Sequence, residues 1–436
     1  MSGESRLALR FRHEEVFVID TRRVAVWMWL ALISVVVVGQ ESAKLSTAEA
    51  KTVVQDFCFG NVKASNAARK RLEAVRAQDR KDVFAAFESA TFKQLSTTPI
   101  SGRRMDAEMS APESTVKMGK CVVVIPAKYN PSKSWPMVFR FHGPGADCET
   151  FSKGWESMKA AEDCIAVFPE IPSKDRLSWT EPGSIQHVKR MFDFVLRQLN
   201  VDTDRVYFTG HSVGCGAALA LAGIWPERVA GLYGSAHLQF AFASEPKLSM
   251  EVIKSVPCVF AVGLKDADAR IQSFRDAEAF AKETSAPWTF HFVPKRGHEP
   301  FPELDKPAFE LLLKSKRTRY PREFSTLFFS NVGSDANDHF KSQNWLRATK
   351  CDTVRGTFCK VSVKDNVVTI DAPRLEAGVL LLNDELVNLD EPVVVMLDGK
   401  EVKRVVVPRS VKFLLDGYDE FPDRRRLFWN ALDFKR

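Results

Sequence analysis

One short stretch, Gly210-His211-Ser212-Val213-Gly214, restricts the fold of this chain more than any other feature. It follows an apolar run that ends at Phe208, and it precedes a run of small and apolar residues that begins at Ala217. The first run favours a strand and the second favours a helix. A Gly-x-Ser-x-Gly stretch between a strand and a helix is typical of a sharp turn that raises the serine hydroxyl above a sheet. The two glycines leave the space that the strand and the helix need to pack closely beneath that turn.

Short apolar runs alternate with helical patterns on both sides of this stretch. The apolar runs predict strands at 121–125, 136–141, 164–168, 206–208, 229–232, 256–262 and 288–293. Helical spacing predicts helices at 185–199, 271–282 and 308–313. Short, wholly apolar strands that alternate with helices indicate a parallel sheet that is covered on both faces. We therefore expect residues 116–319 to form a doubly wound, mostly parallel sheet with its functional loops at the carboxyl ends of the strands.

The segments on either side of this sheet have different patterns. Residues 44–115 contain two stretches of helical spacing, 53–58 and 83–87, and then a polar linker at 97–114, so we expect a helical appendage that packs on the sheet domain. After Tyr320 the apolar residues alternate with polar ones around the turns Lys364-Asp365-Asn366 and Asp398-Gly399-Lys400. These are hairpin signals, so residues 320–436 are expected to form a separate antiparallel β domain.

The N-terminal segment has the pattern of a targeting signal. Arg22 and Arg23 precede an uncharged run, 24–39, that is short for a membrane-spanning helix and suits the apolar region of a signal peptide. We therefore assign residues 1–43 to a signal peptide or to a membrane anchor. Either assignment exports the rest of the chain, which would then be periplasmic, secreted or tethered to the outside of a membrane.

The chain has eight cysteines and no Cys-x-x-Cys pair, which argues against a zinc site. An exported chain can form disulfides. We predict two local pairs, and a third that would pin the helical appendage to the first strand: Cys148–Cys164, Cys351–Cys359 and Cys58–Cys121.

Charge and aromatic content limit the classes of partner. The formal net charge is +7, and the basic residues are scattered. The longest basic cluster, 424–426, is short and is expected to be a solvated face, so no nucleic-acid partner is predicted. In residues 320–436, Trp345 and Trp429 are candidates for a glycan platform, although both are expected to lie in the core.

A serine nucleophile needs a base, a group that orients the base, and donors for the developing oxyanion. In a sheet of this kind the order along the chain is serine, acid, histidine. His298 lies in a Gly-His loop just after the strand that ends near 293, whereas His291 lies within that strand. His298 is therefore the candidate base, and Ser212 is the candidate nucleophile.

Two carboxylates follow the strand that ends near Val262. Asp266 stands three residues after Gly263, in the turn, and Asp268 stands at the entrance to the next helix. We expect Asp266 to bind the Nδ1 side of His298, and Asp268 to face solvent or the helix start, where a carboxylate is favourable. Asp268 is the alternative orienting group.

The oxyanion donors are expected from two places. One is the backbone amide of Val213, which follows the serine. The other is the loop His142-Gly143-Pro144-Gly145, which follows a predicted strand. Pro144 has no amide hydrogen, so the second donor is Gly143, Gly145 or Ala146.

Four motifs together resemble the α/β-hydrolase superfamily: 204–214, 142–145, Gly263-x-x-Asp266 and Gly297-His298. Within it, they are most similar to secreted esterases of the polyhydroxybutyrate depolymerase and feruloyl esterase type. The resemblance covers residues 116–315. It departs from the family's pattern at Cys215, where a second glycine is usual, and at Pro144 in the oxyanion loop. The resemblance implies hydrolysis of acyl esters with neither a metal nor an organic cofactor.

The expected function is therefore that of an exported serine hydrolase acting on a small or polymer-linked carboxylic ester through an acyl-enzyme. A serine peptidase of the same fold remains open, because the same three residue types cleave esters and amides. A third hypothesis is an exported binding protein whose β domain holds a glycan or a surface partner.

Overall fold

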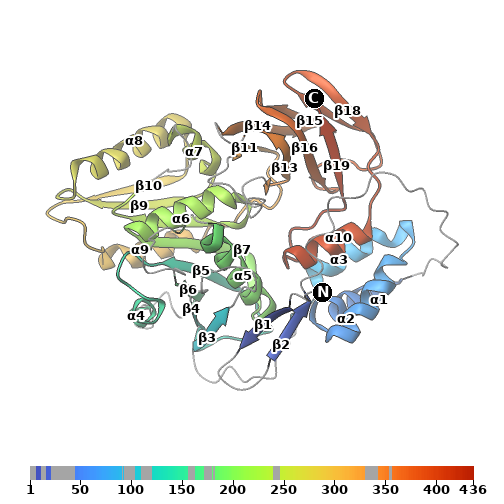
Figure 1. Cartoon of the computed structure of the whole chain (residues 1–436), viewed down its shortest axis with the longest axis horizontal. Coiled ribbons are helices and arrows are strands. Elements are labelled where there is room, and N and C mark those ends of the chain that lie inside the picture. The colour runs from blue at the N-terminus through green and yellow to red at the C-terminus, as the bar shows by residue number, and fades with distance from the viewer. Residues whose placement is uncertain are drawn as a thin grey trace, which may run out of the picture.

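The computed structural model describes residues 6–10, 16–20, 45–90, 92, 104–109, 120–155, 163–170, 179, 182–238, 246–328, 342–352 and 356–436. Figure 1 shows a twisted sheet with helices on both faces at one end of the molecule. Smaller sheets and a cluster of short helices lie at the other end. We refer to residues 120–315 as the sheet domain, to residues 320–436 as the C-terminal unit, and to residues 45–90 as the helical appendage.

The main sheet contains ten strands within the described residues. In spatial order they are β10 (Trp288–Val293), β9 (Cys258–Gly263), β8 (Gly231–Ser235), β7 (Val201–His211), β5 (Trp135–Phe141), β6 (Ile165–Pro169), β4 (Lys120–Val124), β3 (Arg104–Met109), β1 (Arg6–Arg10) and β2 (Val16–Asp20). The strands from β10 to β6 are parallel to one another. From β4 outward, every pairing is antiparallel.

Helices cover both faces of this sheet. One face packs on α5 (Pro182–Gln198), α6 (Val213–Ile224), α7 (Pro246–Ile253) and α8 (Asp268–Thr284). The other face packs on α4 (Cys148–Lys153) and α9 (Pro302–Leu312). Side chains alternate between the two cores, so Val123 belongs to the first and Val122 and Val124 belong to the second. This is the doubly wound, mostly parallel sheet of the α/β-hydrolase fold, as the sequence predicts.

The C-terminal unit has two sheets. One is ordered β11 (Glu323–Phe328), β14 (Thr357–Lys364), β15 (Val367–Asp371), β17 (Val393–Leu397) and β18 (Lys400–Val405). The other is ordered β12 (Ser342–Gln343), β13 (Leu346–Cys351), β16 (Leu375–Leu382) and β19 (Asn430–Lys435). Both predicted hairpins are present, and their turn residues Asp365, Asn366, Asp398 and Gly399 have the positive φ that two-residue hairpin turns need.

Two features of the C-terminal unit differ from the expectation of an antiparallel β domain. Strands β15 and β17 are parallel, because residues 372–392, which include strand β16 in the other sheet, separate them in the chain. A helix, α10 (Val411–Glu420), precedes the last strand. Trp345 and Trp429 are both buried, as expected of core residues.

The helical appendage consists of α1 (Thr47–Phe59), α2 (Val62–Glu73), the short helix η3 (Ala77–Asp79) and α3 (Arg80–Ser89). Its apolar side chains form one core with those of the C-terminal unit, not with those of the main sheet. Phe57 and Phe87, for example, both have their rings against Tyr418 of α10. Figure 1 shows α10 beside α3. The expectation that the appendage packs on the sheet domain is therefore wrong, because its apolar stripes face the C-terminal unit.

The predicted polar linker also differs from the structure. Residues 104–109 form strand β3, which pairs with β4 and extends the main sheet by backbone hydrogen bonds. Strands β1 and β2, within the range assigned to a signal peptide or anchor, continue the sheet beyond β3. The apolar run at 24–39 lies outside the described residues. Among the described residues, no helix combines the length and the apolar character needed to cross a membrane.

The predicted disulfides are wrong, because all eight cysteines are thiols. Cys148 donates to Glu170 (3.1 Å) and Cys58 contacts Tyr418. Burial raises the pKa of the Cys58 thiol to about 12. Cys58 and Cys121 lie in different cores, and Cys351 and Cys359 lie on strands of different sheets and are not bonded to each other. In these cores the cysteines pack as small apolar side chains.

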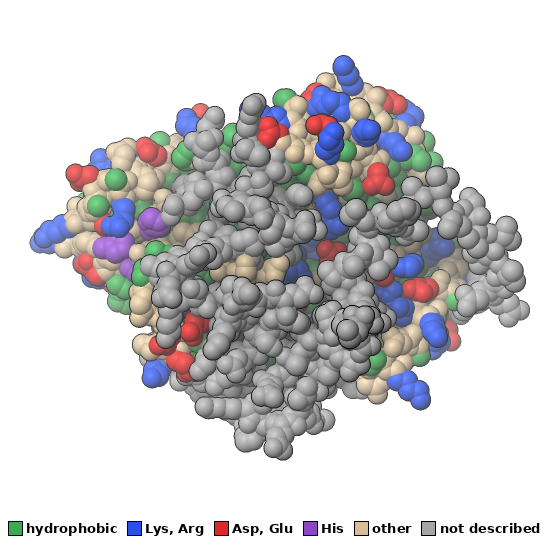
Figure 2. Space-filling view, viewed as in Figure 1, with side chains coloured by type: hydrophobic (Ala, Val, Ile, Leu, Met, Phe, Trp, Pro, Cys, Tyr) green, Lys and Arg blue, Asp and Glu red, His purple; other side chains and the backbone are tan. Residues whose placement is uncertain are grey.

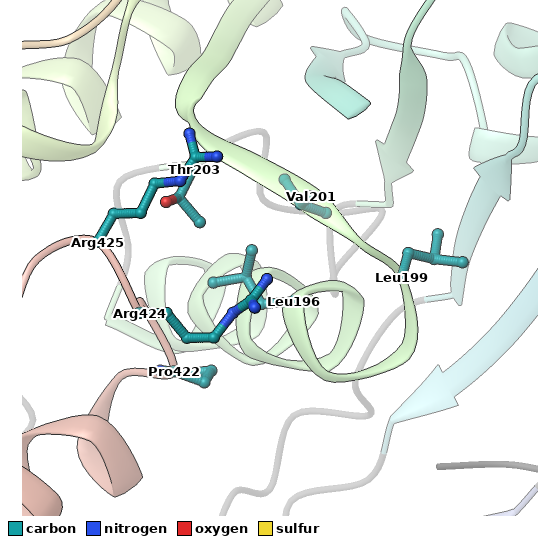
Figure 3. Close-up of a pocket in the computed structure, with 7 residues that line it drawn as sticks. All are labelled: Leu196, Leu199, Val201, Thr203, Pro422, Arg424 and Arg425. Carbon is teal, nitrogen blue, oxygen red and sulfur yellow. The ribbon is translucent and has the colours of Figure 1, made fainter. Parts of the chain in front are cut away.

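A charged junction joins the C-terminal unit to the beginning of β7. Arg317, which is 2% exposed, pairs with Asp423 (2.6 Å) and with Asp204 (3.3 Å). Figure 3 shows a narrow pocket beside it, lined by Leu196, Leu199, Val201, Thr203, Pro422, Arg424 and Arg425. Residues 424–426 are half-buried here, and the Arg425 guanidinium pairs with Asp204 (3.0 Å). The expectation that this basic cluster is a solvated face is therefore wrong.

Candidate active site

The turn between β7 and α6 holds Ser212 in a strained conformation. Ser212 has φ 55° and ψ −127°, which L-residues rarely adopt, and its amide donates to the carbonyl of Ser235 (2.9 Å). A Cβ on Gly210 would lie 2.2 Å from the backbone of Gly214, and one on Gly214 would lie 2.0 Å from the carbonyl oxygen of Phe141. Only glycine fits at either position, so this pair allows the sharp turn that the sequence predicts.

Two short contacts link Ser212, His298 and Asp266. His298 lies in the loop after β10, and its Nε2 is 2.8 Å from the Ser212 hydroxyl oxygen. Its Nδ1 is 2.7 Å from Asp266 Oδ2. A carboxylate only accepts, so Nδ1 carries the hydrogen and Nε2 of the neutral ring is left to accept from the serine. The structure thus brings together the three side chains that the sequence predicts.

Asp266 is fixed by the turn in which it lies. Its side chain is 2% exposed, and Oδ1 accepts from the Ala267 amide (2.7 Å) and from Arg270 (2.9 Å). Burial pushes the pKa of Asp266 up, but the hydrogen bonds from His298, Ala267 and Arg270 outweigh it and hold the pKa below its ordinary value. Asp268 is exposed at the first position of α8, as expected.

Of the four oxyanion candidates, Val213 and Gly143 lie next to the serine. Val213 is the first residue of α6, where backbone amides have no partner within the helix. A Cβ on Gly143 would lie 3.9 Å from that of Ser212, so this residue lies against the serine turn. Gly145 has φ 76° in an exposed turn, with nothing within 4 Å of where its Cβ would be.

Trp179 and His142 support the loop that contains these glycines. The buried Trp179 indole donates to the His142 carbonyl (3.2 Å). His142 Nδ1 lies 2.8 Å from the Gly143 carbonyl, so this nitrogen carries the hydrogen. These two contacts fix the backbone carbonyls of His142 and Gly143.

Two further side chains belong to the site, and neither is predicted from the sequence. The His211 ring lies between the hydroxyl of Ser235 and the backbone carbonyl of His298. Burial is the main cause that lowers the pKa of His211, and the neighbouring His298 lowers it further. The position of His211 directly before Ser212, inside the serine turn, is the sequence feature that could have indicated its place in the site.

Histidine side chains lie together on the face shown in Figure 2, at the end of the molecule where β9 and β10 are. Lysine, arginine and carboxylate side chains surround them there. Among the described residues, no group of three or more His, Cys, Asp or Glu side chains is arranged to hold a metal ion.

Comparisons with known proteins find likeness only at the level of solved structures. No family model matches the chain, and no curated protein matches it. A thermostable esterase is 17% identical, with a TM-score of 0.41, over 49% of this chain and 64% of that one. An S-formylglutathione hydrolase from Staphylococcus aureus is 13% identical, with a TM-score of 0.41, over 48% and 98%. A fluorophosphonate-binding serine hydrolase from the same organism is 13% identical, with a TM-score of 0.37, over 49% and 100%.

Proposed function

We propose that this protein is a serine hydrolase that cleaves carboxylic esters through an acyl-enzyme. The observation that carries the proposal is the chain of two short contacts, 2.8 Å and 2.7 Å, that joins a strained serine to a histidine and a buried carboxylate. A serine hydroxyl is a weak nucleophile until a base takes its proton, and this arrangement supplies the base and orients it.

The proposed reaction begins when Ser212 Oγ attacks the ester carbonyl carbon and His298 Nε2 takes the serine proton. The carbonyl oxygen becomes an oxyanion, which the amide of Val213 and a second amide from Gly143, Gly145 or Ala146 stabilise. His298 then gives its proton to the departing alkoxide, which leaves as an alcohol. Asp266 accepts the hydrogen bond from Nδ1–H throughout and stabilises the imidazolium.

Water completes the cycle. His298 Nε2 takes a proton from a water molecule, which attacks the acyl carbon, and the proton returns to Ser212 as the carboxylic acid leaves. Every proton and every bond in this sequence is supplied by the side chains, the substrate and water, so the proposed reaction uses no cofactor.

The substrate class, a small or polymer-linked ester, is proposed from the resemblance to secreted polyhydroxybutyrate depolymerases and feruloyl esterases.

The burial of Trp345 and Trp429 weighs against the alternative of a glycan-binding β domain, because neither ring is available as a platform. Hydrolysis of short p-nitrophenyl esters, measured beside hydrolysis of aminoacyl anilides, distinguishes the esterase from a peptidase of the same fold.

A fluorophosphonate probe tests the nucleophile directly. We expect the wild-type protein to be labelled at Ser212, and Ser212→Ala to abolish both labelling and ester hydrolysis without lowering the melting temperature. Ser132→Ala, which removes an exposed hydroxyl from another loop, is the matched control and should be labelled normally. Full esterase activity in Ser212→Ala would refute the assignment.

A further inference from the structure

The ring of His211 bridges two strand ends and the loop that carries His298. Its Nδ1 lies 3.0 Å from the hydroxyl oxygen of Ser235, the last residue of β8. Its Nε2 lies 2.9 Å from the backbone carbonyl oxygen of His298. His211 itself is the last residue of β7, directly before Ser212. One side chain therefore connects the ends of β7 and β8 to the loop after β10.

The partners of the ring determine where its hydrogen lies. A carbonyl oxygen only accepts, so His211 Nε2 must carry a hydrogen and donate it to His298. In the neutral ring Nδ1 is then an acceptor, and the hydroxyl of Ser235 donates to it. A hydrogen on Nδ1 instead would leave the His298 carbonyl facing a lone pair. For a neutral ring, the two contacts thus require the Nε2–H tautomer.

The surroundings favour that neutral ring. His211 is half-buried, and the titratable groups that act on it are His298, Asp266 and Glu299. Burial and the neighbouring His298 lower the pKa of His211 and outweigh the contact with the His298 carbonyl and the two carboxylates, which raise it. A second positive charge here would also oppose the imidazolium that His298 becomes during the proposed reaction.

Ser235 contacts both His211 and the turn that holds the nucleophile. Its backbone carbonyl accepts from the Ser212 amide, while its hydroxyl binds His211. The next residue, Ala236, is wholly buried with φ 63°, and its amide donates to the Ala261 carbonyl. A non-glycine residue persists in that conformation only where its surroundings enforce it, so Ser235 has a fixed position.

We propose that His211 and Ser235 are positioning residues that hold the His298 imidazole against Ser212. His211 donates to the His298 carbonyl as the Nε2–H tautomer, and the Ser235 hydroxyl donates to the Nδ1 that this tautomer leaves unprotonated. The inference rests on the proposed function, because its purpose is to keep the base in reach of the nucleophile. Neither side chain is assigned any contact with the substrate.

The contacts can be separated by substitution. His211→Phe keeps a ring of similar size and removes both contacts, whereas His211→Gln keeps an amide donor that reaches about as far as Nε2. A displacement of about 1 Å in a reacting group costs on the order of 10²-fold in rate. We expect His211→Phe to lower kcat for a p-nitrophenyl ester by about that factor, with KM within about twofold of wild type. His211→Gln should recover most of the loss, and Ser235→Ala should fall between them.

His291→Phe is the matched control, since it makes the same replacement at a half-buried histidine of β10 that takes no part in these contacts. The kcat of this variant for the p-nitrophenyl ester should equal that of the wild type. If His211→Phe has wild-type kcat, or if its loss is entirely in KM, the positioning role is wrong. Melting temperatures of all variants accompany the kinetics, so that a folding defect is recognised.

Nitrogen-15 NMR of the histidine rings tests the inference without any turnover. In the wild-type protein we expect His211 to have a protonated Nε2 and an unprotonated Nδ1 at neutral pH, and His298 to have a protonated Nδ1. The opposite tautomer of His211, or a charged ring, would overturn the inference. If the wild-type protein shows the predicted tautomers but neither hydrolyses esters nor reacts with a fluorophosphonate, the proposed function fails and the geometry of the contacts stands.

Discussion

At the scale of single residues, the two oxygens of Asp266 have different partners. Oδ2 faces His298, while Oδ1 is occupied by the Ala267 amide and by Arg270. An asparagine at this position would turn one of these oxygens into a donor, and either orientation of its amide would break a contact. The carboxylate is therefore needed for its charge and for its capacity to accept on both sides.

We predict that Asp266→Asn lowers kcat by about 10⁴-fold, because the imidazole would lose the partner that fixes its tautomer and stabilises its charge. Asp268→Asn should change kcat little, because Asp268 is exposed at the start of α8. Kinetics with a p-nitrophenyl ester measures both. The reverse ranking would mean that Asp268 orients the base in the active enzyme.

The two glycines of the 142–145 loop should respond differently to alanine. A Cβ at Gly143 meets only ordinary contacts at 3.5 Å and 3.9 Å, but it would lie against the serine turn. A Cβ at Gly145 has open space, yet the left-handed φ of 76° costs an L-residue about 1–2 kcal/mol. We predict that Gly143→Ala reduces kcat/KM with little loss of stability, and that Gly145→Ala mainly reduces stability.

Urea unfolding and ester kinetics on the two variants provide the comparison. A larger loss of kcat/KM in Gly145→Ala than in Gly143→Ala would place the second oxyanion donor at the exposed turn instead.

The sequence pattern predicted the site residues that follow strand ends. It did not predict the residues whose role depends on contacts with distant segments of the chain. Ser212, His298 and Asp266 follow strand ends at expected positions, and the contacts expected between them are present, while their catalytic roles stay predictions. Ser235 is one serine among many in the sequence. Only the pairing of β8 with β7 brings its hydroxyl to His211.

At the scale of elements, one missed helix had left a signal. Ser410 caps α10 by accepting from the Phe413 amide, and the buried residues of the helix recur at helical spacing: Val411, Leu414, Leu415 and Tyr418. A serine cap followed by that spacing predicts a helix. Strand β3 had also left a signal, because polar and apolar residues alternate strictly from Arg104 to Met109, which is typical of a strand.

The association of the helical appendage with the C-terminal unit had no signal in the sequence. The two segments are more than two hundred residues apart, and periodicity shows which face of a helix is apolar but not what covers it. The structure places Phe87 wholly inside their common core, with ring contacts to Phe57 and Tyr418. The appendage is thus part of the fold of the C-terminal unit.

We predict that Phe87→Ala destabilises the protein by about 3–5 kcal/mol, because it removes a large side chain from a packed core. Val62→Ala is the control, since Val62 is a helical apolar residue that is 79% exposed, and it should change stability by less than about 0.5 kcal/mol. Urea unfolding followed by circular dichroism measures both. Equal effects would mean that the appendage does not share a core with the C-terminal unit.

At the scale of the whole molecule, strand β7 connects the charged junction to the candidate site. Asp202 and Asp204 lie near its beginning and bind arginines, and His211 and Ser212 lie at its end. A displacement of the C-terminal unit would therefore act on the same strand that positions the serine. The sequence carries no signal of this link, because the arginines that bind Asp204 come from segments more than a hundred residues away.

The junction should make stability depend on pH. Burial pushes the pKa of Asp423 up, but Arg317, Thr203 and Arg425 outweigh it, so the pKa lies below its ordinary value of 3.8. A carboxyl with a lowered pKa contributes stability that is fully present above its unfolded-state pKa and is lost as the pH falls through its folded-state pKa. The wild-type free energy of unfolding should therefore fall below about pH 4.

Asp423→Asn tests whether this pair causes the fall. The substitution removes the shorter of the two carboxylate contacts of the buried Arg317 and leaves the contact with Asp204 at 3.3 Å, so the expected cost is at most about 3–5 kcal/mol at pH 7. The variant should also lose less stability than the wild type between pH 7 and about pH 3, because the titrating group is gone. Asp163→Asn, which breaks the exposed pair with Lys128, is the control and should cost at most about 1 kcal/mol. If urea unfolding shows the same loss in both variants, with unchanged pH dependence, the buried pair does not hold the two parts of the molecule together.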